Sequence, residues 1–150
     1  MHLVRRFLGF LTAKPLTPAE QSAIASMLDP PIAQAFFAQR SEDQRHAFDV
    51  RERVGGHEHL YQAALLHDIG KTGPALGALS RSFATIWSRL GLRATGRWND
   101  YLSHGEIGAE QLEALGADRL AVAFARNHPG SPPPGVDAES WHLLEQADVA

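Results

Sequence analysis

The stretch Ala63-Ala64-Leu65-Leu66-His67-Asp68-Ile69-Gly70-Lys71-Thr72 is an apolar run that ends in an imidazole, a carboxylate, a glycine and an ammonium group. Neutral imidazole nitrogen and carboxylate oxygen are both good ligands of divalent metals, and one carboxylate can bridge two ions. An isolated His-Asp pair is more often a helix end whose side chains are satisfied locally. The pair therefore indicates a site only together with other residues of the chain.

Further side chains of the same chemical types recur along the chain. They are His46 in Gln44-Arg45-His46-Ala47-Phe48, His104 in Leu102-Ser103-His104-Gly105, His128 in Arg126-Asn127-His128-Pro129, and Asp148 in Gln146-Ala147-Asp148. With His67 and Asp68 they form the ordered series H, HD, H, H, D. Several imidazoles and two carboxylates buried without partners would each cost roughly 1–3 kcal/mol, whereas shared metal coordination removes that cost. The ordered set therefore indicates a metal site.

This series resembles the HD-domain superfamily of metal-dependent phosphohydrolases, from about Ser41 to the end of the chain. The resemblance implies an all-α fold, a single-domain helical bundle in which residues 41–150 form the HD domain. Residues 1–40 are then expected to supply N-terminal helices that pack on the same domain, and either cover its core or form a dimer surface.

The resemblance also implies the roles of individual residues. One divalent ion is expected to be held by His46, His67, Asp68 and Asp148. Asp68 is then expected to bridge to a second ion held by His104 and His128. Such a pair clamps a phosphate and activates water by lowering its pKa from 15.7 toward about 7, so Asp68 also counts as catalytic. Lys71 matches the family's lysine that steadies negative charge on the phosphoryl group.

The expected activity is cleavage of a phosphate ester or anhydride, with a nucleotide as the small-molecule substrate and Fe, Mn, Co, Ni, Zn or Mg as the ion. The branch that hydrolyses cyclic dinucleotides carries a Gly-Tyr-Pro signature, whereas Pro129-Gly130-Ser131 follows His128 here. The segment His104 to Glu110 is closer to small stand-alone hydrolases, including those that split diadenosine tetraphosphate. HD-type di-iron oxygenases share the same ligand order and remain an alternative. A catalytically silent metal-binding module is a further alternative.

The composition argues against several other classes of protein. A chain of 150 residues with 44% hydrophobic content suits one domain with a core. The net charge of −3 and pI of about 6.2 do not favour binding to a nucleic-acid polymer, and the absence of cysteine excludes thiolate metal sites and disulfides. Arg5 and Arg6 interrupt the first apolar stretch, no run approaches the about 18 residues of a membrane span, and a cytoplasmic location is expected.

Helix signals place these residues on inward faces. Capping boxes predict helix starts at Thr17 and Ser41, and Asp29 and Asp137 are predicted to cap two further helices. His46 shares a stripe with Val50 and with Arg53 or Val54, and Asp148 shares one with Trp141 and Leu144. Gly55-Gly56 and His128-Pro129 predict helix ends. Tyr101 to Leu115 and Ala117 to Asn127 are predicted helices, with His104 on the side of Ile107.

The segment Gly73 to Asn99 is the least determined. Its apolar residues lie at helical spacing and predict another helix, followed by a loop from Gly91 to Arg97. Its arginines are candidates for phosphate contacts, although arginine on a helix face is usually solvated. They are Arg81, Arg89, Arg93 and Arg97.

Overall fold

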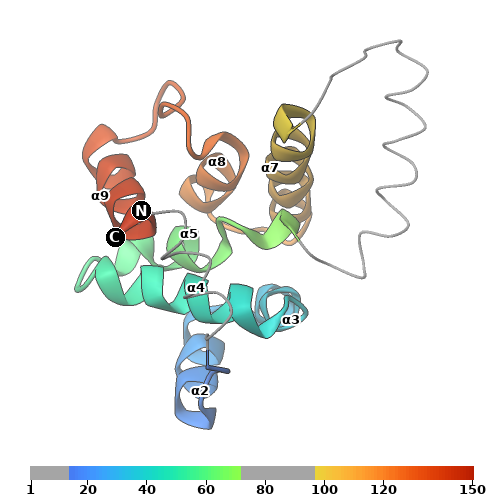
Figure 1. Ribbon diagram of the computed structural model, residues 1–150. Coiled ribbons are helices and arrows are strands. Elements are labelled where there is room, and N and C mark those ends of the chain that lie inside the picture. The colour runs from blue at the N-terminus through green and yellow to red at the C-terminus, as the bar shows by residue number, and fades with distance from the viewer. Residues whose placement is uncertain (1–13, 72–96) are drawn as a thin grey trace.

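The computed structural model describes residues 14–71 and 97–150, and these residues form helices and no strand. Figure 1 shows the helices in chain order: α2 (Pro18–Met27), α3 (Pro30–Phe37), α4 (Ser41–Arg53), α5 (Tyr61–Leu66), α7 (Arg97–Ala114), α8 (Arg119–Asn127) and α9 (Ala138–Val149). Two short 3-10 turns flank α5, namely η1 (Glu58–Leu60) and η2 (Ile69–Lys71). The all-α fold class is therefore confirmed.

The signals at the helix ends are partly confirmed. Thr17 and Glu20 form the predicted reciprocal capping box, and Asp137 accepts a hydrogen bond from the Ser140 amide at the start of α9. His128 is the extended C-cap of α8, as the following proline requires. The prediction for Asp29 was wrong in part, because this residue is the N-cap of α3 but its side chain makes no capping hydrogen bond.

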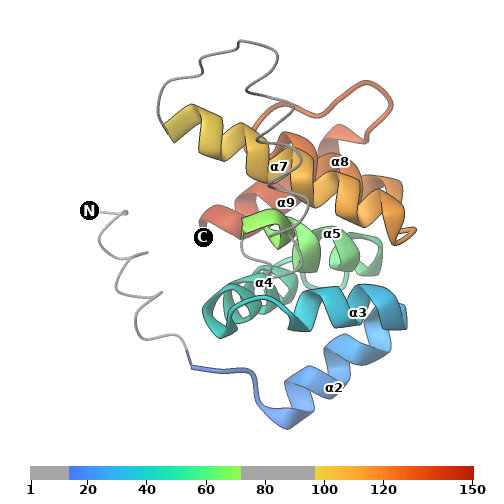
Figure 2. The ribbon, with the colours of Figure 1, turned by 90° about the vertical axis from the view of Figure 1, so that its right-hand side faces the viewer.

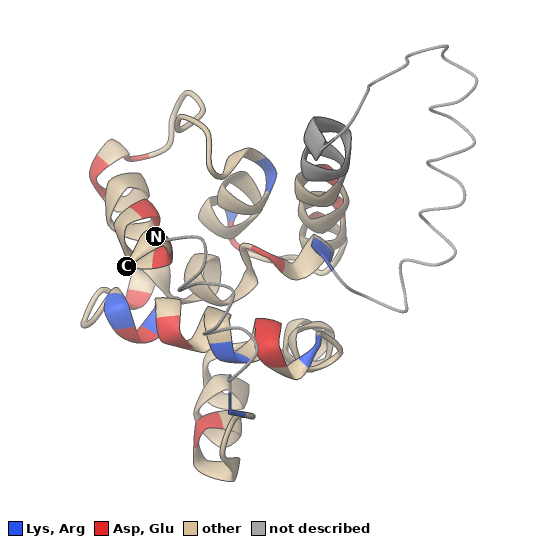
Figure 3. Ribbon diagram, in the orientation of Figure 1, with Lys and Arg blue, Asp and Glu red and all other residues tan. Residues whose placement is uncertain are grey.

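The predicted cap at Ser41 was wrong. Arg40 is the N-cap of α4, and Ser41 is its first residue, with its hydroxyl directed to Glu42. The helix begins one residue earlier than the box requires. Figure 3 shows acidic and basic residues along this helix. Its first turn carries Glu42 and Asp43 and its last turn carries basic residues, an arrangement that complements the helix dipole.

Helix α5 lies at the centre of the described fold. It contacts α4 on one side and α8 and α9 on the other, as the two views in Figure 1 and Figure 2 agree. The four residues from Ala63 to Leu66 are fully buried, which explains why this segment is apolar on every face. Ile24 of α2 and Ile32 and Phe36 of α3 belong to the same hydrophobic cluster. Hydrophobic burial thus holds the chain rigid immediately before His67.

Glycines allow η2 and α8 to approach the backbone of α7. A Cβ built on Gly70 would lie 2.0 Å from the His104 carbonyl oxygen and 2.8 Å from the Gly108 nitrogen. A Cβ on Gly105 would lie 2.9 Å from the Arg126 carbonyl oxygen of α8. Helix α5 ends at Leu66, and Gly70 lies within η2, where the lack of a Cβ allows the turn after Asp68 to dock on α7.

The remaining predictions on elements divide between described and undescribed residues. The helix predicted from Tyr101 begins earlier, at Arg97. Arg97 was predicted as the last residue of a loop and is instead the first residue of α7. The helix and loop predicted over residues 73–96, with Arg81, Arg89 and Arg93, lie outside the described residues. Each helix in the part that the structure describes is too short or too polar to cross a membrane.

Candidate metal centre

His67 lies at the end of α5, where a backbone hydrogen bond orients its ring. It is the C-cap residue of the helix and only 5% exposed. Its Nδ1–H donates a hydrogen bond of 2.9 Å to the Ala64 carbonyl oxygen one turn earlier. This bond directs Nε2 away from α5, which is the arrangement found in most metal-binding histidines.

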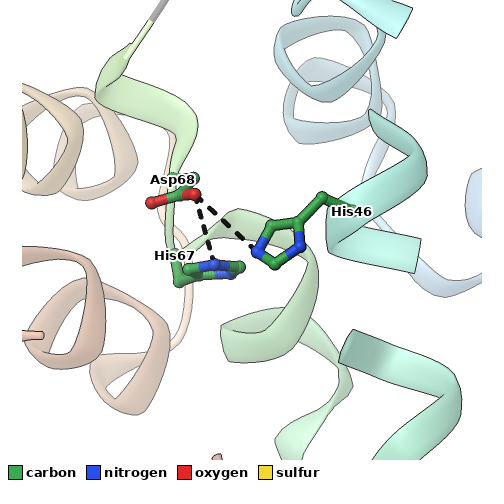
Figure 4. Close-up of side chains that lie close together, drawn as sticks. All are labelled: His46, His67 and Asp68. Carbon is green, nitrogen blue, oxygen red and sulfur yellow. Dashed lines mark ion pairs between the residues drawn. The ribbon is translucent and has the colours of Figure 1, made fainter. Parts of the chain in front are cut away.

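Two other elements bring side chains to His67 Nε2. Figure 4 shows His46 of α4 reaching toward His67 and Asp68, with ion pairs from Asp68 to both imidazoles. The Asp68 Oδ2 lies 3.4 Å from His67 Nε2 and 4.0 Å from His46 Nε2. From α9, Asp148 Oδ1 lies 2.8 Å from His46 Nε2 and 3.3 Å from His67 Nε2.

These separations fit ligands of one ion. Two atoms each about 2.0–2.2 Å from a divalent ion lie roughly 3 Å apart at a right angle and roughly 4 Å apart when opposite. The ligand atoms of His46, His67 and Asp68 lie within 4.8 Å of one another, and Asp148 adjoins both imidazoles. In addition, the buried Nε2 of His67 makes no hydrogen bond of good geometry. The donor set therefore fits a divalent cation.

The electrostatics of the cluster show how strongly its charges interact. Burial alone would lower the pKa of His67, but the carboxylates of Asp68 and Asp148 raise that pKa to about 10. Burial would likewise raise the pKa of both carboxyl groups, yet His67 with Lys71 lowers that of Asp68, and three imidazoles lower that of Asp148. The cluster thus offers two carboxylates as anions, ready to take a cation.

His128 joins the cluster through Asp148. Its Nε2 lies 3.0 Å from Asp148 Oδ2, so the two oxygens of this carboxylate face different imidazoles. The ring of His128 stacks on Phe124, with centroids 4.6 Å apart, and lies 5.8 Å from the ring of His67. The structure therefore brings together three of the four predicted histidines and both acids.

The cluster opens onto a cavity of about 410 Å³. Its polar lining consists of His67, Asp68, Lys71, His104, His128 and Asp148. The Lys71 ammonium lies 2.6 Å from Asp68 Oδ2, and its side chain is half exposed. His104 is exposed, unlike the buried position that sharing a side with Ile107 suggested, because it stands in the cavity wall on α7.

Two aromatic residues contribute to the site although the sequence analysis assigned neither of them a role there. Phe124 carries the ring of His128, and the edge of Trp141 packs on Phe124 at 4.9 Å between centroids. A signal was present, since Phe124 precedes His128 by four residues, one helical turn.

The comparison with protein families agrees with this geometry. A family model described as HD domain matches residues 44–148. Since the match covers more than half of the chain, the protein belongs to the HD domain family, and the resemblance read from the ordered histidines and aspartates is confirmed. Metal-dependent hydrolysis is the general activity of this family. Neither the search of curated proteins nor the search of solved structures finds a match.

Proposed function

We propose that the protein is a metal-dependent phosphohydrolase that cleaves a phosphate ester or anhydride of a nucleotide. The observation that carries the proposal is the convergence of His46, His67, Asp68 and Asp148 from α4, the end of α5 and α9, with ligand-type atoms 2.8–4.0 Å apart. The cavity beside them has a volume in the range of small-molecule sites, about 300–1,000 Å³. We favour a dinucleoside polyphosphate as the substrate and keep a cyclic dinucleotide as a second candidate, because Pro129-Gly130-Ser131 stands after His128 in place of the Gly-Tyr-Pro signature.

The assignment of ligands follows from position. His46, His67, Asp68 and Asp148 are the residues we assign to the first ion, because their atoms face one point. His104 and His128 line the same cavity, and we assign them to a second ion. A bound divalent ion supplies Lewis acidity toward a phosphoryl oxygen and lowers the pKa of water toward neutrality.

Lys71 has a distinct role in this proposal. Its ammonium reaches Asp68 from the cavity side, and its partly exposed side chain is free to meet an anionic substrate. A cation beside the reacting phosphoryl group stabilises charge that increases in the transition state. Lys71 is therefore assigned to the chemical step and not to metal retention.

The experiment is a phosphate-release screen over nucleotides with Mn, Fe, Co, Ni, Zn or Mg, combined with metal analysis. His67→Ala and Asp68→Ala are expected to lose metal and activity together. Lys71→Ala is expected to keep its metal and lose rate by about 10²–10³-fold, the usual cost of removing one charge-stabilising donor. The control is Lys14→Ala, an exposed lysine that does not line the cavity.

Three results would contradict the proposal. Normal turnover by Asp68→Ala would exclude this carboxylate from the reaction. A mixed-valent iron pair with no phosphate release from any nucleotide would favour the oxygenase instead. Stable metal binding without turnover of any nucleotide would favour a catalytically silent metal-binding module.

A further inference from the structure

We propose that Trp141 is a positioning residue, which holds His128 against Asp148 and so orients the carboxylate toward the metal. The inference rests on the proposed metal centre and goes beyond it, because Trp141 is not among the residues that line the cavity. Trp141 is 1% exposed and lies on α9, seven residues before Asp148 and hence on the same face two turns away.

The first contact is a hydrogen bond to the segment that follows His128. The indole Nε1–H of Trp141 donates to the Gly130 carbonyl oxygen at 3.0 Å. Gly130 is two residues beyond His128, in the connection between α8 and α9. The bond therefore ties the backbone next to His128 to the helix that carries Asp148.

The second contact acts through Phe124. The Trp141 and Phe124 rings meet edge to face, with an interplanar angle of 78° and a centroid distance of 4.9 Å. On its other side Phe124 stacks on His128 at an interplanar angle of 29°. Such aromatic pairs favour one relative orientation. Trp141 thus limits the rotation of the His128 ring as well as the path of its backbone.

The position of His128 affects the metal ligands through its contact with Asp148. With His128 Nε2 3.0 Å from Oδ2, the other oxygen, Oδ1, faces His46 and His67 at 2.8 and 3.3 Å. If His128 moves, Asp148 loses this contact at Oδ2, and we infer that Oδ1 then shifts from the position that the first ion requires. Partners of this kind typically change metal affinity by about 10–100-fold when they are removed.

The test compares cobalt affinity in Trp141→Phe and the unaltered protein, measured by titration of Co(II) against a competing chelator. The variant keeps an aromatic ring and removes the N–H donor. We expect an affinity about tenfold lower, the smaller end of the range for residues that orient ligands. Phe36→Leu is the matched control, since it replaces a fully buried aromatic side chain of α3 with a smaller apolar one. It should lower the melting temperature and leave cobalt affinity unchanged.

To distinguish a positioning role from a general loss of stability, the same substitution is also made in a protein that already carries His128→Ala. In His128→Ala, adding Trp141→Phe should lower cobalt affinity no further, because the route to Asp148 is already broken. Phe124→Leu, which removes the stacked ring, should behave in the same way. Equal losses with and without His128, or an unchanged affinity in Trp141→Phe, would overturn the inference. Failure of the unaltered protein to bind Co(II) would instead contradict the proposed metal centre.

Discussion

Gly70→Ala tests whether the turn after Asp68 owes its position to close contact with α7. The added Cβ would lie 2.0 Å from the His104 carbonyl oxygen, whereas ordinary contact begins at 3.4 Å. The turn must therefore withdraw by about 1.4 Å, since the opposing atoms are helix backbone and have little freedom to yield.

The size of the effect follows from this displacement. Overpacking of a buried contact costs about 1–3 kcal/mol, which for a chain of this length lowers the melting temperature by roughly 2–12 °C. The Lys71 amide donates to the Asp68 carbonyl oxygen across the turn, so the shift is transmitted to Asp68. Metal ligands tolerate displacements of only about 0.2–0.5 Å. We therefore expect at least a tenfold loss of metal affinity.

The assay is thermal unfolding of the metal-free protein together with metal titration, with Gly56→Ala as the control. A Cβ at Gly56 meets nothing within 4 Å, so this variant should match the unaltered protein in both measurements. A Gly70→Ala protein with unchanged melting temperature and unchanged metal affinity would refute the reasoning, because it would show that the turn does not dock on α7 as described.

Three further predictions concern charge. Asp148→Asn, which removes the anion facing three imidazoles, should weaken metal binding by more than about 100-fold in the same titration, and unchanged binding would exclude it as a ligand. The raised pKa of His67, about 10, means that metal-free protein at pH 7.5 must release about one proton per ion, so affinity should rise with pH, and calorimetric enthalpies should vary with the buffer's ionisation enthalpy. Because Arg45 lowers the pKa of Glu20 from 4.5 to about 2, their pair stabilises the folded protein above pH 4.5 and is lost as pH falls toward 2. Arg45→Ala should therefore lower the urea midpoint at pH 5 more than at pH 2, and equal losses would contradict this.

The sequence alone predicted much of the local structure because helical periodicity is a local property. The stripe of His46, Val50 and either Arg53 or Val54 was predicted from a spacing of three and four residues, and the structure places Val50 and Val54 in the core. The stop at His128-Pro129 follows from the steric restriction that proline imposes on the residue before it. The N-cap of α4 at Arg40 was missed, since a capping-box pattern does not fix which residue the backbone uses as the N-cap.

Only the tertiary structure decided which helix faces pack against one another. The order of histidines and aspartates determined the family and the candidate ligands, because those depend on chemical type and order along the chain. The sharing of Asp148 between His46, His67 and His128 depends on how α4, α8 and α9 pack around α5. Packing distances are set by contacts between residues far apart in sequence, and no spacing along one helix contains that information.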